Sequence, residues 1–197
     1  MFEGNLEELK NGLKKLPGIG GKTAERLAFF LISSKKETAL NLAKLISNSV
    51  NSIKRCETCN ILFEESPCNF CKNESRLKNV ICVVEKTQDV YLIENTSEYK
   101  GKYFVLGNLI SPPDGIGPQQ IHFTKLEKLV RENDIKELIL ALNPSSEGET
   151  TMSFISSKLK SKNLKITRLA TGLPIGGDIE YTSSMTLASA LKNRNEI

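Results

Sequence analysis

Four cysteines form two close pairs in one short stretch of the chain. They follow the pattern C-x2-C-x8-C-x2-C, made by Cys56, Cys59, Cys68 and Cys71. Each pair can hold one side of a tetrahedral metal ion, and four thiolates fill the coordination sphere of zinc without leaving a position open for a substrate. The spacing therefore predicts one structural Zn²⁺ per chain, in a compact knuckle whose folding depends on the metal.

Two disulfides in an exported protein are the alternative interpretation of the same pattern. The chain opens MFEGNLEELK, which lacks the charged start and the apolar run of a cleavable signal, so we expect a cytoplasmic protein with reduced thiols. No stretch reaches the ~20 continuous apolar residues of a membrane span, and no membrane partner is expected. The fifth cysteine, Cys82, lies in an apolar run and is expected to be a buried core thiol.

A glycine-rich turn between two helical segments carries basic side chains. The turn contains Gly18 and Gly20, and Lys22 and Arg26 follow it one helical turn apart. Glycines let the backbone approach a phosphate, and the start of a helix offers free N–H groups and positive potential. These residues therefore predict DNA binding through phosphate contacts, independent of base sequence. An ordinary helix pair with solvated charges is the alternative.

Carboxylates follow two of the predicted strands. Glu85 ends the apolar run 80–84, and Glu147 and Glu149 follow a later run, at the strand ends where ligands bind in open α/β sheets. Converging carboxylates could hold Mg²⁺ for phosphoryl transfer. The preferred interpretation is that Glu147 and Glu149 lie at a helix N-terminus, where the helix dipole favours negative charge. His122 is the only histidine, so a side-chain nucleophile with a histidine base is not expected either.

Apolar spacing divides the chain into a helical part and an α/β part. Helices are expected from the N-terminus to Pro17, from Lys22 onward, and over 37–54. Beyond the cysteines, short apolar runs alternate with helical stretches, which predicts a mostly parallel sheet with helices packed on it. The runs are 80–84, 103–106, 138–142 and 165–169, and the clearest helices are 123–132 and 151–160. The Pro- and Gly-rich segment 111–118 predicts an ordered loop without regular structure.

The net charge of +4 comes from the N-terminal part of the chain. Residues 1–79 hold 13 Lys and Arg against 9 Asp and Glu, whereas the remainder is balanced at 14 of each. A modest positive excess fits an anionic partner such as nucleic acid without requiring one. Composition therefore permits DNA binding but does not decide it.

The order of these parts resembles the RecR family of bacterial recombination mediators. The resemblance is carried by the hairpin 16–28, the four cysteines, the strand 81–85, the loop 111–118, the strand end 143–149 and the segment 172–181. It implies an α+β multidomain fold. The implied parts are a helix-hairpin-helix DNA-binding domain over residues 1–54, a four-cysteine zinc finger over 55–78, a Toprim-like α/β domain over 79–172, and a C-terminal helical segment over 173–197 that belongs to an oligomer interface.

The same resemblance implies a DNA-binding adaptor in recombinational repair that is not an enzyme. Such a protein acts with RecO, and with RecF where that protein is present, to help RecA load onto single-stranded DNA coated by single-strand-binding protein. A ring-like homo-tetramer that can surround DNA, in a cytoplasmic and nucleoid-associated location, is implied as well. The DNA contacts of the family fall on Lys22 and Arg26, and its zinc ligands fall on the four cysteines.

Two other functions are alternatives. A Toprim enzyme would use Mg²⁺ to prime, nick or cleave nucleic acid, but the Asp-x-Asp pair of active Toprim enzymes is replaced here by Asn143-Pro144-Ser145. The resemblance associates the remaining Glu85 with partner contacts, and we assign Glu147 to the same role. A local departure is Phe30, where many relatives carry a histidine. The other alternative is a zinc-stabilised interaction module without a nucleic-acid role.

Overall fold

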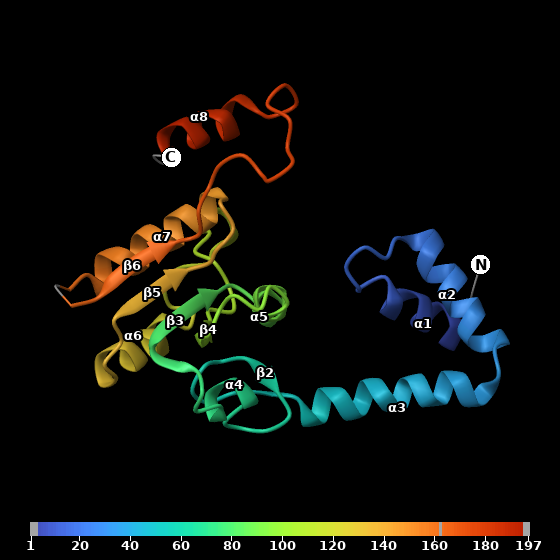
Figure 1. The fold of residues 1–197 in the computed structure, drawn as a ribbon. Coiled ribbons are helices and arrows are strands. Elements are labelled where there is room, and N and C mark those ends of the chain that lie inside the picture. The colour runs from blue at the N-terminus through green and yellow to red at the C-terminus, as the bar shows by residue number, and fades with distance from the viewer. Residues whose placement is uncertain (1–3, 162, 195–197) are drawn as a thin grey trace. The chain divides into compact units, whose positions relative to one another are not determined.

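The computed structural model describes residues 4–161 and 163–194 (Figure 1). The chain divides into two compact units, one ending at Ile53 and one beginning at Lys54. The first unit is helical, and the second contains the cysteines, a parallel sheet and the C-terminal helix. The fold is therefore mixed, with the helical part, the cysteine cluster and the α/β part following one another in the predicted order.

The first unit consists of α1 (Asn5–Leu13), α2 (Gly21–Ser33) and α3 (Lys36–Ser52). Helices α1 and α2 pack together, and the small side chains of Ala24 and Ala28 on α2 are buried. The prediction that the first helix runs to Pro17 was wrong, because α1 ends at Leu13. The last residues before Pro17 form tight turns, with the N–H of Leu16 donating to the carbonyl of Leu13. Proline restricts the residue before it to extended conformations, which ends the helix early.

Helix α3 has an apolar side that the other described helices of the first unit leave exposed. None of its residues is buried, and Leu40, Leu45, Ile46 and Val50 are all more than half exposed. The predicted apolar spacing is therefore present, but these apolar side chains are not covered within the first unit.

A four-stranded parallel sheet forms the centre of the second unit. Its strands are β3 (Leu77–Val84), β4 (Gly101–Val105), β5 (Glu137–Leu140) and β6 (Lys165–Arg168), in the order β4-β3-β5-β6. Each predicted run overlaps one of these strands, with bounds that differ by up to three residues. A parallel sheet is covered on both faces, which is why its strands appear in the sequence as continuous apolar runs rather than as alternating ones.

The two faces of the sheet have separate cores. Ile81, Val83 and Phe104 belong to the first core, which the helices α6 (Phe123–Glu132) and α7 (Ser146–Leu159) complete. Cys82 and Val84 belong to the second core, which includes the cysteines of the C-x2-C pairs and helix α5 (Thr87–Glu94). Successive residues of one strand thus point alternately to the face covered by α6 and α7 and to the face covered by the cysteine segment.

The cysteine segment has little regular structure of its own. It contains the short antiparallel strands β1 (Lys54–Arg55) and β2 (Leu62–Phe63) and the one-turn helix α4 (Asn69–Lys72). The chain ends in helix α8 (Ser184–Lys192). No helix in the described part of the chain is both long and apolar enough to cross a membrane.

Two local expectations need correction, and one helix was not predicted. Helix α7 begins at Ser146 rather than at 151, because the Ser145 hydroxyl caps it by accepting a hydrogen bond from the N–H of Gly148 at 3.1 Å. The segment 111–118 contains a short 3-10 helix, η1 (Pro112–Asp114), since proline presets the backbone angle of a first helical turn. Helix α5 was not predicted, because it spans only eight residues.

Candidate metal centre, nucleic-acid interface and sheet-end pocket

The four paired cysteines converge on one point. Their sulfur atoms all lie within 4.8 Å of one another. The Cys56 and Cys71 sulfurs are 3.9 Å apart, and those of Cys59 and Cys68 are 3.4 Å apart. Sulfurs arranged tetrahedrally at ~2.3 Å from a zinc ion would be ~3.8 Å apart. The cluster therefore has the donor set and the dimensions that one zinc ion requires.

Two tight turns bring these sulfurs together. After Cys56 the chain turns through Asn60, whose φ of 66° is left-handed, and the N–H of Asn60 donates back to the carbonyl of Cys56 at 2.9 Å. Cys68 directly precedes helix α4, and the N–H of Cys71 donates to the Cys68 carbonyl at 2.9 Å. The backbone N–H of Cys68 also points at the Cys56 sulfur, at 3.4 Å. An N–H directed at a sulfur stabilises a thiolate, which is the form that binds a metal.

The protonation of these thiols is strongly linked. A hydrogen bond shared with Cys68 raises the pKa of Cys59, and the same contact lowers the pKa of Cys68. Crowded sulfurs therefore cannot titrate independently, whereas a divalent cation at their centre would stabilise the thiolate at all four positions.

Disulfides do not link these residues, because all five cysteines are free thiols. Cys82 lies apart from the cluster, on β3, and is almost completely buried. Burial raises the pKa of the Cys82 thiol to about 12, which keeps it protonated and unreactive at neutral pH. The prediction of a buried core thiol is confirmed.

The hairpin between α1 and α2 is open on its glycine side. Gly18 has a φ of +79°, which L side chains rarely adopt, and a Cβ atom placed on Gly18 or Gly20 would meet nothing within 4 Å. Gly20 precedes α2 without a side-chain cap, and the first hydrogen bond to its carbonyl comes from Ala24. The first N–H groups of α2 thus remain available to an outside acceptor.

Lys22 and Arg26 stand on the first two turns of α2 and are both exposed. Neither makes a hydrogen bond or an ion pair with any residue in the described ranges 4–161 and 163–194. Lys14 and Lys15, just before the turn, are exposed as well. The hairpin therefore combines unneutralised cations, open backbone donors and a helix N-terminus, which together suit an anion such as a phosphate.

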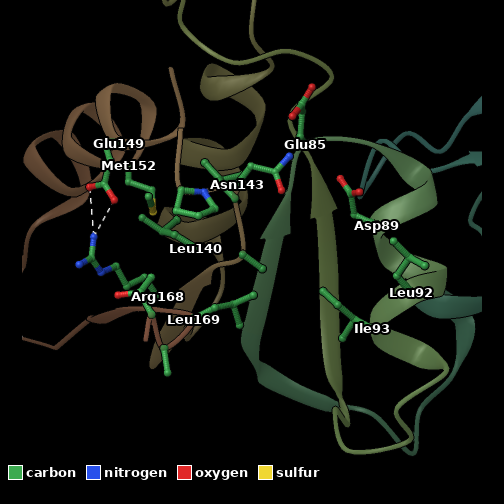
Figure 2. A pocket seen from close by; sticks show the side chains of 15 residues that line it. Glu85, Asp89, Leu92, Ile93, Leu140, Asn143, Glu149, Met152, Arg168 and Leu169 are labelled. Atoms are coloured by element: carbon green, nitrogen blue, oxygen red, sulfur yellow. Dashed lines mark hydrogen bonds and ion pairs between the residues drawn. The ribbon is translucent and has the colours of Figure 1, made fainter. Parts of the chain in front are cut away.

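A cavity of about 270 Å³ lies at the carboxyl ends of the strands (Figure 2). Glu85 follows β3 and lines this cavity; its side chain is 16% exposed and pairs with the ammonium of Lys86 at 3.0 Å. Glu149 lines the opposite side and accepts two hydrogen bonds from Arg168, at 2.9 and 3.1 Å. Much of the remaining wall is aliphatic. The site is an apolar pocket with a charged rim.

Glu147 does not line this cavity, although Glu149 does. Both glutamates lie in the first turn of α7. Hydrogen bonds from its own backbone N–H and from Ser145 lower the pKa of Glu147. This position is where a negative charge is favoured by the helix dipole, as the preferred interpretation of the sequence supposed.

Comparison with known proteins places the chain in a family. Its segments 6–50, 79–170 and 172–195 match, in turn, the helix-hairpin-helix of RecR, the Toprim domain and the C-terminal part of RecR. Over all of its 197 residues the chain is 46% identical to the recombination protein RecR of Gloeobacter violaceus, covering all of that protein. The chain belongs to the RecR family. It is also 45% identical to the recombination protein RecR of Gloeothece citriformis and 41% identical to that of Saccharophagus degradans, covering 98% and 100% of those proteins.

The candidate sites of this RecR-family chain fall in different parts of the matched sequence. The hairpin glycines and cations fall within 6–50, and the sheet-end pocket falls almost wholly within 79–170. The four cysteines lie between these two segments. The assignment of these cysteines as metal ligands therefore rests on their own geometry and not on a matched segment.

The pocket contains an acidic group that was not predicted from the sequence. Asp89 lines the cavity beside Glu85, from the first turn of α5, and its carboxylate accepts a hydrogen bond from the N–H of Lys86 at 2.8 Å. Asn143 projects into the same space (Figure 2). The spacing of Glu85 and Asp89, four residues apart, is the signal that could have drawn attention to Asp89 had helix α5 been predicted.

Proposed function

We propose that this protein is a DNA-binding mediator of recombinational repair. In this role it acts with RecO, and with RecF where that protein is present, to promote RecA loading onto single-stranded DNA coated by single-strand-binding protein. Membership of the RecR family supports a role in recombination, since full-length relatives are named recombination proteins. The protein would work in the cytoplasm, at the nucleoid.

The observation that carries the proposal is that the two cations of the hairpin are exposed and not neutralised. Lys22 and Arg26 are exposed and lack any carboxylate partner in the described part of the chain, and they follow the open turn at Gly18 and Gly20. Contacts of this kind go to phosphates and carry no base information, so the protein binds DNA of any sequence. The preference for single- or double-stranded DNA is a property to measure.

Four cysteine thiolates hold one structural zinc ion. The ion joins the two halves of the segment 56–71, whose own regular structure is limited to the two-residue strand β2 and the one-turn helix α4. Structural zinc contributes folding free energy directly, ~10–16 kcal/mol of apparent binding free energy at neutral pH in small zinc domains. Chelation should therefore unfold this segment, and freshly purified reduced protein should contain about one zinc per chain. Metal analysis well below one equivalent would refute the assignment.

The sheet-end pocket serves partner docking, and the protein is not a nucleic-acid-cleaving enzyme. Active Toprim enzymes place paired aspartates where this chain has Asn143 and Ser145. Glu85, at the rim of a largely aliphatic pocket, could pair with a basic group of RecO, and Glu147 offers a second carboxylate on α7. Removing one partner of a buried interfacial charge pair costs about 2–5 kcal/mol, so Glu85→Gln should weaken RecO binding while sparing the fold.

A ring-like homo-tetramer is supported by apolar side chains that the single chain leaves uncovered. They include Leu45 and Val50 on α3 and, in the C-terminal segment, Ile175, Tyr181 and Met185. Large exposed apolar patches mark interaction sites. The proposed domains are 1–54, 55–78, 79–172 and 173–197. The contacts between subunits would then be made by the first and the last of these domains.

RecA loading is the direct test. RecA filament formation on coated single-stranded DNA, with RecO present, should start sooner when the parent protein is added. The double variant Lys22→Ala, Arg26→Ala should lose most of this effect, whereas Lys44→Ala, which removes an exposed cation on α3, should retain it. If the parent protein does not shorten the lag, the mediator function is wrong. If it cleaves or primes DNA with Mg²⁺ or Mn²⁺ in a Glu85-dependent manner, the enzyme alternative is correct.

A further inference from the structure

Two lysines of the α/β part reach the backbone of the cysteine cluster. The ammonium of Lys125, on α6, donates a hydrogen bond to the carbonyl oxygen of Cys56 at 3.1 Å. The ammonium of Lys102, on β4, donates to the carbonyl oxygen of Cys71 at 3.0 Å. Cys56 and Cys71 belong to different C-x2-C pairs, so each half of the cluster is held by one lysine from elsewhere in the sequence.

A third ligand residue is tied to the sheet through the backbone alone. The N–H of Val105, on β4, donates to the carbonyl of Cys59 at 2.9 Å. The side-chain amide of Asn60 returns a hydrogen bond to the carbonyl of Val105 at 2.7 Å, and Asn60 is buried. The cluster is therefore fixed on the sheet by several bonds, of which only the two lysine bonds bring charge.

Neither Lys102 nor Lys125 has a carboxylate partner among the described residues. Both side chains are half-buried. Two other lysines of the second unit do pair with carboxylates: Lys72 with Glu65 at 2.9 Å and Lys128 with Glu132 at 3.9 Å. Taking an ammonium partly out of water without an anion is unfavourable, so some negative charge should lie near each of these two lysines.

The metal centre supplies that charge. A divalent ion with four thiolates carries two net negative charges, and the two lysines carry two positive charges. The sulfur of a cysteine is only four bonds from its carbonyl oxygen, so each ammonium lies within about 8 Å of a ligand sulfur, the screening length at physiological ionic strength. The attraction between the lysines and the loaded cluster is therefore not screened away, and it disappears when the metal leaves and the thiols are protonated.

We propose that Lys102 and Lys125 are positioning residues for the metal centre. They hold one cysteine of each pair in place and offset the charge of the zinc tetrathiolate, so that metal binding and attachment of the knuckle to the sheet stabilise each other. This proposal rests on the zinc assignment made above. Outer-shell groups of metal sites typically change the metal affinity by about 10–100-fold when removed.

The test compares zinc affinity by competition with a chromophoric chelator. Lys102→Met and Lys125→Met should each raise the zinc dissociation constant by about 10-fold or more, and the double variant should raise it further. Arginine at either position, which keeps the charge, should restore most of the affinity. Lys100→Met is the matched control for Lys102, because the Lys100 ammonium bonds a carbonyl outside the cysteine segment, that of Ser97, at 2.7 Å. Lys128→Met is the control on α6. Both controls should bind zinc like the parent.

A second measurement separates a metal role from simple packing. The unfolding midpoints of the parent, Lys102→Met and Lys125→Met are recorded with zinc and after chelation. The variants should fall below the parent only in the zinc form. If the parent binds zinc, two results would overturn the role of the lysines alone. One is an equal loss of stability in the zinc and the chelated forms, and the other is a zinc affinity of the variants equal to that of the parent. A parent that binds no zinc would overturn the metal centre and this proposal together.

Discussion

Replacement of Lys22 and Arg26 should change the salt dependence of DNA binding by a predictable amount. Both side chains are exposed and free of carboxylate partners among the described residues, so neither is neutralised before DNA arrives. Each can therefore contact one phosphate and release its condensed counterions. For duplex DNA, one lost phosphate contact lowers the magnitude of the slope of log affinity against log salt by about 0.9.

This slope gives a measurable ratio. Between about 50 mM and about 200 mM salt, the affinity advantage of the parent over a single variant should shrink about 3.5-fold, and that over the double variant should shrink about 12-fold. The slope is obtained by titrating fluorescent duplexes of two unrelated sequences at four or more salt concentrations. The loss should be the same for both sequences, because phosphate contacts carry no base information.

The control is Lys44→Ala, which removes an exposed cation of α3 outside the hairpin. Its slope should remain close to that of the parent. If Lys22→Ala and Arg26→Ala have the parent slope, or change it no more than Lys44→Ala does, the hairpin is only structural. If the loss depends on the DNA sequence, the contacts reach bases and the phosphate argument is wrong.

Three further predictions concern the second unit. Gly148→Ala should destabilise the protein by about 2–3 kcal/mol in denaturant titrations, because the added Cβ atom would overlap a backbone carbonyl oxygen. Gly20→Ala is the control and should cost less than about 1 kcal/mol, because a Cβ atom at Gly20 would meet nothing within 4 Å. Burial acts to raise the pKa of Glu94, but hydrogen bonds from Arg76 and a neighbouring tyrosine outweigh it and hold the pKa below its usual value. The stabilisation from this pair should therefore be present above about pH 4.3 and be lost as the pH falls through the lowered pKa of the folded state. Glu94→Gln should then lower the free energy of unfolding by about 1.5 kcal/mol at pH 7 and by progressively less as the pH falls below about 4.3. Cys82 should resist alkylation at pH 8 in the folded protein and react only after unfolding, as mass spectrometry would detect, since its thiol is buried with a pKa of about 12.

The features that the sequence predicted are those with local causes. Cys56 and Cys71 could be assigned to one cluster because each C-x2-C turn is set by the residues within it. The strand around Cys82 was evident because a buried parallel strand requires apolar side chains on both faces. Helix 123–132 was found with its observed bounds because its apolar residues recur along one face.

The features that were missed depend on contacts between distant segments. Helix α5 is short and begins after Lys86, a residue type that gives no capping signal, so Asp89 could not be placed at the pocket. The lysine bonds to the cysteine carbonyls join residues up to 69 positions apart, which no spacing rule addresses. Nor does periodicity state whether an apolar helix face such as that of α3 will be covered by its own chain.

The position of the cysteine knuckle has a consequence for solubility. Strand β4 is at the edge of the sheet, and both the N–H and the carbonyl of Val105 are occupied by the knuckle, through Cys59 and Asn60. An uncovered edge strand pairs readily with another chain, and β4 is rich in apolar and aromatic residues. A chain that loses its knuckle would thus expose a strand able to recruit its copies. Chelation should then produce aggregates that bind amyloid dyes, because the folded knuckle would otherwise keep this edge from pairing with other copies of the chain.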